Sequence, residues 1–136
     1  MTLLYAGIEV RLREVILKDK PAAMLAASSK GTVPVLVQSN GTVIDESRDI
    51  MRWALNQNDP AGWLECADGD NLLVDRCDNE FKHWLDRYKY AVRFPEHDEG
   101  WYRQQGEQFL AQLEIRLSQW HYLTGASLSV VDVAIA

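Results

Sequence analysis

The fold is decided by residues 29–47, which have the sequence SKGTVPVLVQSNGTVIDES. The apolar run 33–37 predicts a β-strand, and residues 42–45 predict a second strand that returns alongside it. Asn40 and Gly41 stand between the two runs and form the strongest two-residue hairpin signal. This stretch therefore predicts a β-hairpin.

The segments around the hairpin predict helices and one more strand. Residues 1–6 predict the end of a helix, and Gly7 predicts its left-handed cap. The alternating pattern of residues 8–17 predicts a strand, and residues 22–27 predict a short helix. Ser47 predicts the N-cap of a helix after the hairpin. The buried positions of that helix are expected at Ile50, Met51, Ala54 and Leu55. The N-terminal part of the chain is therefore expected to be α/β.

The C-terminal part of the chain is predicted to be helical throughout. Residues 57–63 break the pattern and predict a linker. Two helices are expected beyond it, with apolar stripes at Leu73, Cys77, Phe81, Trp84, Tyr88 and Ala91, and at Phe109, Leu113, Leu117 and Trp120. Ser129 and Asp132 form a capping box that predicts the start of a last helix. We expect a domain over residues 1–56 and an all-helical domain over 64–136.

Composition excludes several classes of function. The net charge of −6 and the pI near 5.0 argue against a nucleic-acid or anionic-membrane partner, because binding phosphate requires cations. No apolar run is long enough to cross a bilayer, so we expect a cytoplasmic protein without membrane contact. The spacing of Cys66 and Cys77 fits neither a redox pair nor a zinc site, and we expect no disulfide. The motif Glu80-x-x-His83 has no matching carboxylates on other helices, so no metal site is expected.

The start of the hairpin carries the candidate chemistry. The bond between Val33 and Pro34 is a candidate cis peptide, in which the N–H and C=O of Val33 face outward and can pair with an extended peptide ligand. Glu46 and Ser47, at the predicted helix start, offer a carboxylate for an ammonium and donors for a carboxylate. Lys20 offers a charge-assisted bond to a second carboxylate. These groups suit a short peptide with one amino-acid end and a second carboxylate, and glutathione is such a peptide.

Three pieces of sequence occur in a fixed order: Lys20-Pro21, then KGTVPVL at residues 30–36, then GTVIDES at residues 41–47. Together they resemble the thioredoxin-like N-terminal domain of the glutathione transferases, and are most similar to the omega-like and bacterial branches that use cysteine or serine. Residues 122–125 and the capping box after them resemble the C-terminal-domain signature of the same family. The resemblance implies an α/β thioredoxin-like N-terminal domain followed by an all-α C-terminal domain.

The resemblance also implies roles for individual residues. Val33 would pair with the cysteinyl main chain of glutathione, and Pro34 would be the structural cis-proline. Glu46 and Ser47 would hold the γ-glutamyl end, and Lys20 would hold the glycine carboxylate. The implied activity is transfer of glutathione to a small hydrophobic or electrophilic co-substrate, or reduction of mixed disulfides with it, by a homodimer.

The sequence departs from the family at its ends. The first strand and the catalytic residue of the family precede the region that matches Met1, so no catalytic residue is assigned. Because that strand lies in the middle of the family's sheet, both this domain and the helical domain are expected to be incomplete. Cys66 and Cys77 do not match the catalytic position. Two alternatives to an enzyme remain open: a non-catalytic interaction module with the same fold, and an inactive fragment.

Overall fold

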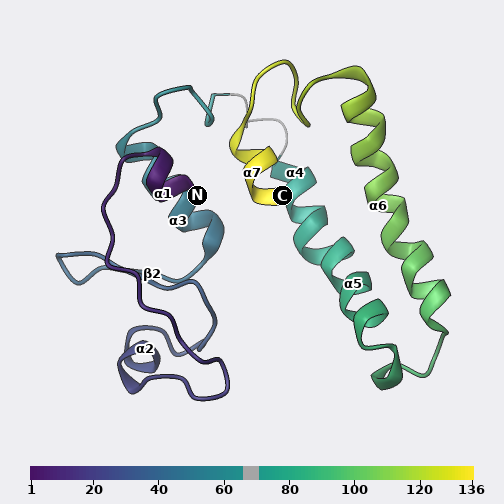
Figure 1. The fold of residues 1–136 in the computed structure, drawn as a ribbon, viewed down its shortest axis with the longest axis horizontal. Coiled ribbons are helices and arrows are strands. Elements are labelled where there is room, and N and C mark those ends of the chain that lie inside the picture. Colours follow the sequence, from purple (N-terminus) through teal and green to yellow (C-terminus); the bar gives the residue numbers. More distant parts are fainter. Residues whose placement is uncertain (66–70) are drawn as a thin grey trace. The chain divides into compact units, whose positions relative to one another are not determined.

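The computed structural model describes residues 1–65 and 71–136. These residues form two compact units, Met1–Ala61 (unit 1) and Gly62–Ala136 (unit 2). Figure 1 shows their helices and strands. The division between the units falls inside the segment that the sequence predicts as a linker. Cys66, for which the sequence predicts no disulfide, lies outside the described residues.

Unit 1 combines short helices with a small sheet. Its α1 ends because Gly7 adopts a φ of +70°, which a residue without a Cβ tolerates, and the Gly7 N–H donates to the Leu4 carbonyl at 3.0 Å. The N-terminal helix packs against the last helix of the unit (Figure 1). The apolar side chains buried in this unit are Ala6, Ile50, Ala54 and Leu55. The elements are α1 (Thr2–Tyr5), α2 (Ala22–Ala27), β1 (Leu36–Val37), β2 (Val43–Ile44) and α3 (Ser47–Gln57).

The predicted hairpin is present, with a different loop. β1 and β2 are antiparallel, with Leu36 opposite Ile44. The expected two-residue loop is wrong, because such a loop in its preferred form needs a positive φ at both residues, and only Gly41 (φ +86°) has one. Instead, the Gln38 N–H donates to the Thr42 carbonyl at 2.8 Å and closes a three-residue loop. The loop length fixes the register in which the hairpin leads into α3.

The strand predicted over residues 8–17 is wrong. The segment contains no strand, and its one ladder contact is an isolated bridge between Ile16 and Asp19. Most of its apolar side chains are exposed, with Leu12 at 80%, and none is buried. A strand needs a neighbour that pairs with its N–H and C=O groups, and the sheet of the described residues contains only β1 and β2. Alternation alone therefore does not produce a strand here.

Unit 2 is helical, as expected. The single long helix predicted from Leu73 to Ala91 is wrong in detail, because it contains a π-helical turn and ends at Tyr90, whose φ of −123° leaves the helical region. A π turn adds one residue to a helical turn. The spacing of the apolar residues is compatible with a continuous α-helix and with a helix that contains a π turn, so the sequence pattern does not distinguish them. The elements are α4 (Asn71–Arg76), the π turn η1 (Cys77–Phe81), α5 (Lys82–Lys89), the 3₁₀ turn η2 (Ala91–Arg93), α6 (Glu99–Gln119) and α7 (Val130–Ile135).

The core of unit 2 forms where the helices meet. α5 packs along α6 (Figure 1), and the rings of Phe81 and Phe109 stack with their centroids 5.3 Å apart. Part of the stripe predicted on α6 is wrong, since Leu117 and Trp120 are exposed. The elements that pack on α6 are α5 and η1, and α6 ends at Gln119, so Trp120 lies outside the helix. The buried core cluster consists of Leu73, Val74, Cys77, Phe109, Leu123 and Val131.

The capping box that starts α7 is present. The Asp132 carboxylate accepts from the Ser129 N–H at 3.0 Å, and the Ser129 hydroxyl accepts from the Val131 N–H at 3.2 Å. Asp132 also accepts from the Leu123 N–H at 2.7 Å, so one carboxylate fixes both the helix and the loop before it. Within the residues described, no helix is long and apolar enough to cross a bilayer.

Candidate functional site

The Val33–Pro34 bond lies just before β1 and is cis in the structure. The Val33 side chain is 50% exposed. Among the described residues, no other group forms a hydrogen bond with the N–H or the C=O of Val33. An exposed main-chain donor and acceptor on one residue can pair with an extended peptide as another strand would.

Glu46 and Ser47 stand at the start of α3. The prediction that Ser47 is the N-cap is wrong by one position: Glu46 is the cap residue and Ser47 is the first helical residue. Glu46 has extended φ and ψ while its carbonyl already accepts from the Ile50 N–H at 3.0 Å, which is the N-cap arrangement. The Glu46 side chain makes no cap hydrogen bond, and the Ser47 side chain is exposed and forms no hydrogen bond with another described residue. Its hydroxyl therefore remains available beside the first N–H groups of the helix.

The sequence interpretation missed Lys30, which connects the two parts of the candidate site. Its Nζ lies 2.5 Å from Oε1 of Glu46 and 3.1 Å from Oδ1 of Asp45. The Ser28 hydroxyl donates to Asp45 at 2.6 Å. We call these four residues the Lys30 cluster. The available signal was the acidic pair at positions 45 and 46, which requires a cation, but the sequence does not show which lysine supplies it.

Hydrogen bonds within the Lys30 cluster shift the pKa values of Asp45 and Lys30. The hydrogen bond from Ser28, followed by the one from Lys30, lowers the pKa of Asp45 below its usual value. The hydrogen bonds to Glu46 and then Asp45 raise the pKa of Lys30. Both shifts favour the ionised forms of the Asp45 carboxylate and the Lys30 ammonium, which face each other at 3.1 Å.

Lys20 lies against the same loop from another side. A Cβ placed on Gly31 would lie 3.5 Å from the Lys20 Nζ and 3.3 Å from a methyl carbon of Leu25. Gly31 has a φ of +61°, which favours a glycine at this position. The Lys20 ammonium thus lies near the main chain two residues before Val33.

The structure therefore gathers the predicted residues around residues 30–34, which we call the 30–34 loop. The Lys20 side chain lies near this loop at Gly31, and Glu46 contacts the loop at Lys30. Val33 and Pro34 belong to the loop, and Ser47 follows Glu46. Two cations, an exposed carboxylate and an exposed main-chain pair therefore lie within a few residues of each other.

The cysteine and the metal-like motif of unit 2 are both engaged in structural contacts. Cys77 is a free thiol in the core, and burial raises the pKa of that thiol. The Glu80 carboxylate accepts from Arg76 at 2.9 Å, and the His83 ring lies 3.1 Å from Arg87. No group of three metal-ligating side chains occurs in the part of the chain that the structure describes.

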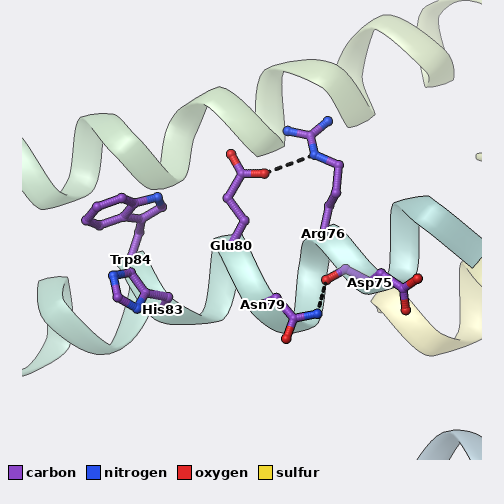
Figure 2. A pocket seen from close by; sticks show the side chains of 6 residues that line it. All are labelled: Asp75, Arg76, Asn79, Glu80, His83 and Trp84. Atoms are coloured by element: carbon purple, nitrogen blue, oxygen red, sulfur yellow. Dashed lines mark hydrogen bonds and ion pairs between the residues drawn. The ribbon is translucent and has the colours of Figure 1, made fainter.

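A cavity of about 490 Å³ lies along the helical run that contains the π turn, and residues of unit 2 alone line it. Figure 2 shows Arg76, Glu80 and Trp84 in one row at i, i+4 and i+8, pointing toward α6. A second row with the same spacing consists of Asp75, Asn79 and His83. Because Arg76 and Glu80 already pair, and Arg76 also donates to Gln112, the charges facing this cavity are largely neutralised from within the protein.

Several solved structures share the fold of this chain. Glutathione S-transferase 1-6 from Anopheles dirus species B is 20% identical with a TM-score of 0.78, and the match covers 98% of this chain and 67% of that chain. A class Gtt2 glutathione S-transferase of Vibrio parahaemolyticus is 21% identical with a TM-score of 0.73, over 98% and 70%. A delta-class glutathione transferase of Nilaparvata lugens is 21% identical with a TM-score of 0.77, over 98% and 67%. A search of the curated proteins finds no match.

The family comparison agrees with this fold. The family model described as "Glutathione S-transferase, N-terminal domain" matches residues 1–62, which contain every residue of the candidate site. The fold is a thioredoxin-like N-terminal domain of the glutathione S-transferase type followed by a helical C-terminal region. On these two findings, residues 1–62 match the N-terminal domain of the glutathione S-transferases, and the chain shares the fold of solved glutathione S-transferases.

Proposed function

We propose that this chain binds glutathione and acts as a glutathione transferase, either conjugating glutathione to an electrophile or reducing mixed disulfides with it. The observation that carries the proposal is the meeting of Lys20 and Glu46 at the 30–34 loop. The match of residues 1–62 to the N-terminal domain of the glutathione S-transferases supports the same ligand.

Each polar group of glutathione has a partner of suitable chemistry in this arrangement. The N–H and C=O of Val33 pair with the main chain of the cysteinyl residue, next to the cis bond to Pro34. Glu46 takes the ammonium of the γ-glutamyl end, and Ser47 with the first N–H groups of α3 takes its carboxylate. Lys20 takes the glycine carboxylate.

The chemistry then depends on the thiolate of the bound glutathione. A thiolate is the reactive form, and a nearby helix N-terminus or cation stabilises it. The second substrate is a small hydrophobic or electrophilic compound, and the working form is a homodimer in the cytoplasm. We assign no catalytic residue in this chain.

One observation favours a second candidate, a glutathione-binding module without catalysis. The thiol of Cys77 is buried and its pKa is raised, which opposes formation of a thiolate. A conjugation assay with a reactive aryl halide and a thiol-transfer assay with a mixed disulfide separate the two candidates, since the module binds glutathione and gives turnover in neither.

The ligand proposal is tested with Ser47→Ala. Because Ser47 is exposed and its side chain forms no hydrogen bond with another described residue, its removal should leave folding nearly unchanged. Loss of one charge-assisted hydrogen bond should weaken glutathione binding by about 1–3 kcal/mol in titration calorimetry. Ser39→Ala, in the exposed hairpin loop, is the matched control and should leave the affinity unchanged. Absence of glutathione binding by the parent chain would overturn the proposed function, and equal affinities of parent and Ser47→Ala would remove Ser47 from the site.

A further inference from the structure

The start of α3 carries two adjacent carboxylates, on Asp45 and Glu46. Both acidic residues immediately precede the first helical residue, where the proposed function places the α-carboxylate of the γ-glutamyl end. Like charges at such distances repel, and the partial positive charge of a helix start amounts to only about half an elementary charge. Without a cation, this surface would admit the ligand's ammonium and repel its carboxylate.

Lys30 supplies that cation. Its Nζ pairs with both carboxylates, while its side chain stays 49% exposed. An ammonium has three donors, and these two ion pairs use two of them. Lys30 therefore retains the capacity to donate to a third acceptor that arrives from solvent.

Lys20 does not fill this role. Its ammonium lies near Gly31 and forms no ion pair with Asp45 or Glu46, whereas Lys30 pairs with both. The two lysines therefore serve different parts of the loop. A peptide that pairs with Val33 and carries a carboxylate at each end meets one lysine at each end.

We propose that Lys30 is a specificity-determining residue that binds the α-carboxylate of the γ-glutamyl end, and so selects a zwitterionic α-amino-acid end over a plain amine. This inference rests on the proposed function. The ammonium of the ligand takes the face of Glu46 that Lys30 leaves open. The carboxylate of the ligand takes the third donor of Lys30.

The test compares two probes by titration calorimetry on the full 136-residue chain. One probe is glutathione, and the other is 4-aminobutyryl-cysteinyl-glycine, which keeps the ammonium but lacks the α-carboxylate. Lys30→Met keeps the length of the side chain and removes its charge. It should weaken glutathione binding by about tenfold or more, the effect of losing a charge-assisted hydrogen bond. The same variant should bind the aminobutyryl probe as well as the parent chain does, or more tightly.

Two further variants control the experiment. Lys89→Met, at the exposed end of α5, makes the same change in net charge and should alter neither affinity. Lys30→Arg keeps the charge and should keep the preference of the parent chain for glutathione. Lys30→Gln is a second variant without the charge. If circular dichroism shows that Lys30→Met is unfolded, the ratio of the affinities for glutathione and for the aminobutyryl probe is measured with Lys30→Gln instead.

The outcomes separate this inference from the proposed function. If the parent chain binds glutathione but loss of Lys30 weakens both probes equally, or neither, the inference is overturned and the proposed function stands. If the parent chain does not bind glutathione, both are overturned. A loss confined to the probe with the α-carboxylate supports the assignment of Lys30.

Discussion

Different kinds of contact stabilise the interior of unit 1 and the interior of unit 2. Unit 2 buries a contiguous apolar cluster around Phe109, which is 1% exposed. Unit 1 buries small or helical apolar residues of α1 and α3, whereas most apolar side chains of the 8–17 segment are exposed. Around the 30–34 loop its contacts are mainly polar, from the Lys30 cluster and from Lys20. The unit with the weaker core therefore carries the candidate binding groups.

The difference has a physical basis. A side chain in a packed core is not accessible to a ligand, and Cys77 in unit 2 is an example. Polar groups that meet only one another at a surface, as in the Lys30 cluster, remain accessible and exchange partners at low cost. A binding site for a charged peptide therefore suits unit 1, and stability is expected to depend most on unit 2.

The largest effect should follow loss of an aromatic side chain from the core of unit 2. Phe109→Ala should lower the free energy of unfolding by about 3–5 kcal/mol, because it removes a fully buried ring and leaves a cavity. Urea unfolding followed by far-ultraviolet circular dichroism measures this change. Leu12→Ala, in the exposed 8–17 segment, should cost less than about 0.5 kcal/mol. If both variants lost the same stability, the contrast between the two units would be broken.

The second effect concerns the start of α7. Asp132→Ala removes the capping box and the bond to the Leu123 N–H, and should cost about 0.5–2 kcal/mol in thermal or urea unfolding. Glutathione affinity should not change, because Asp132 belongs to unit 2. Asp98→Ala removes the single cap bond to the Trp101 N–H at the start of α6, and should cost less. A loss of glutathione affinity with unchanged stability in Asp132→Ala would contradict the division of roles between the units.

The features that the sequence predicted well depend on short-range contacts. Gly7 ends a helix through its own φ, and the capping box joins Ser129 to a residue three positions later. The hairpin signal at Asn40 and Gly41 located the turn but not the number of loop residues, since that depends on whether Asn40 also adopts a positive φ. Local chemistry thus fixed the end of α1 and the start of α7 to within about one or two residues.

The features that the sequence did not predict depend on partners far along the chain. The 8–17 segment alternates as a strand should, but a strand forms only beside another strand. Lys30 contacts residues 15 and 16 positions away, and nothing near it in sequence identifies them. The same holds for Lys20, which lies near Gly31, eleven positions further along the chain. The sequence therefore predicted the residues of the candidate site from their chemical types, but it did not predict Lys30, which connects them.

The smallest expected effect tests whether polar contacts hold unit 1 together around the site. The hydrogen bond from the Ser28 hydroxyl lowers the pKa of Asp45. A carboxylate with a lowered pKa in the folded state stabilises the fold at any pH above the pKa that it has in the unfolded chain, about 3.9. That contribution disappears as the pH falls through the folded pKa, when Asp45 becomes protonated. Ser28→Ala should therefore be less stable than the parent chain at pH 7, and part of this difference should vanish below about pH 4. Urea unfolding across this pH range measures it, with Ser29→Ala as the control for an exposed neighbour. A difference that stayed constant from neutral to acid pH would mean that Ser28 acts only through packing, and unit 1 would then resemble unit 2 more than its polar contacts suggest.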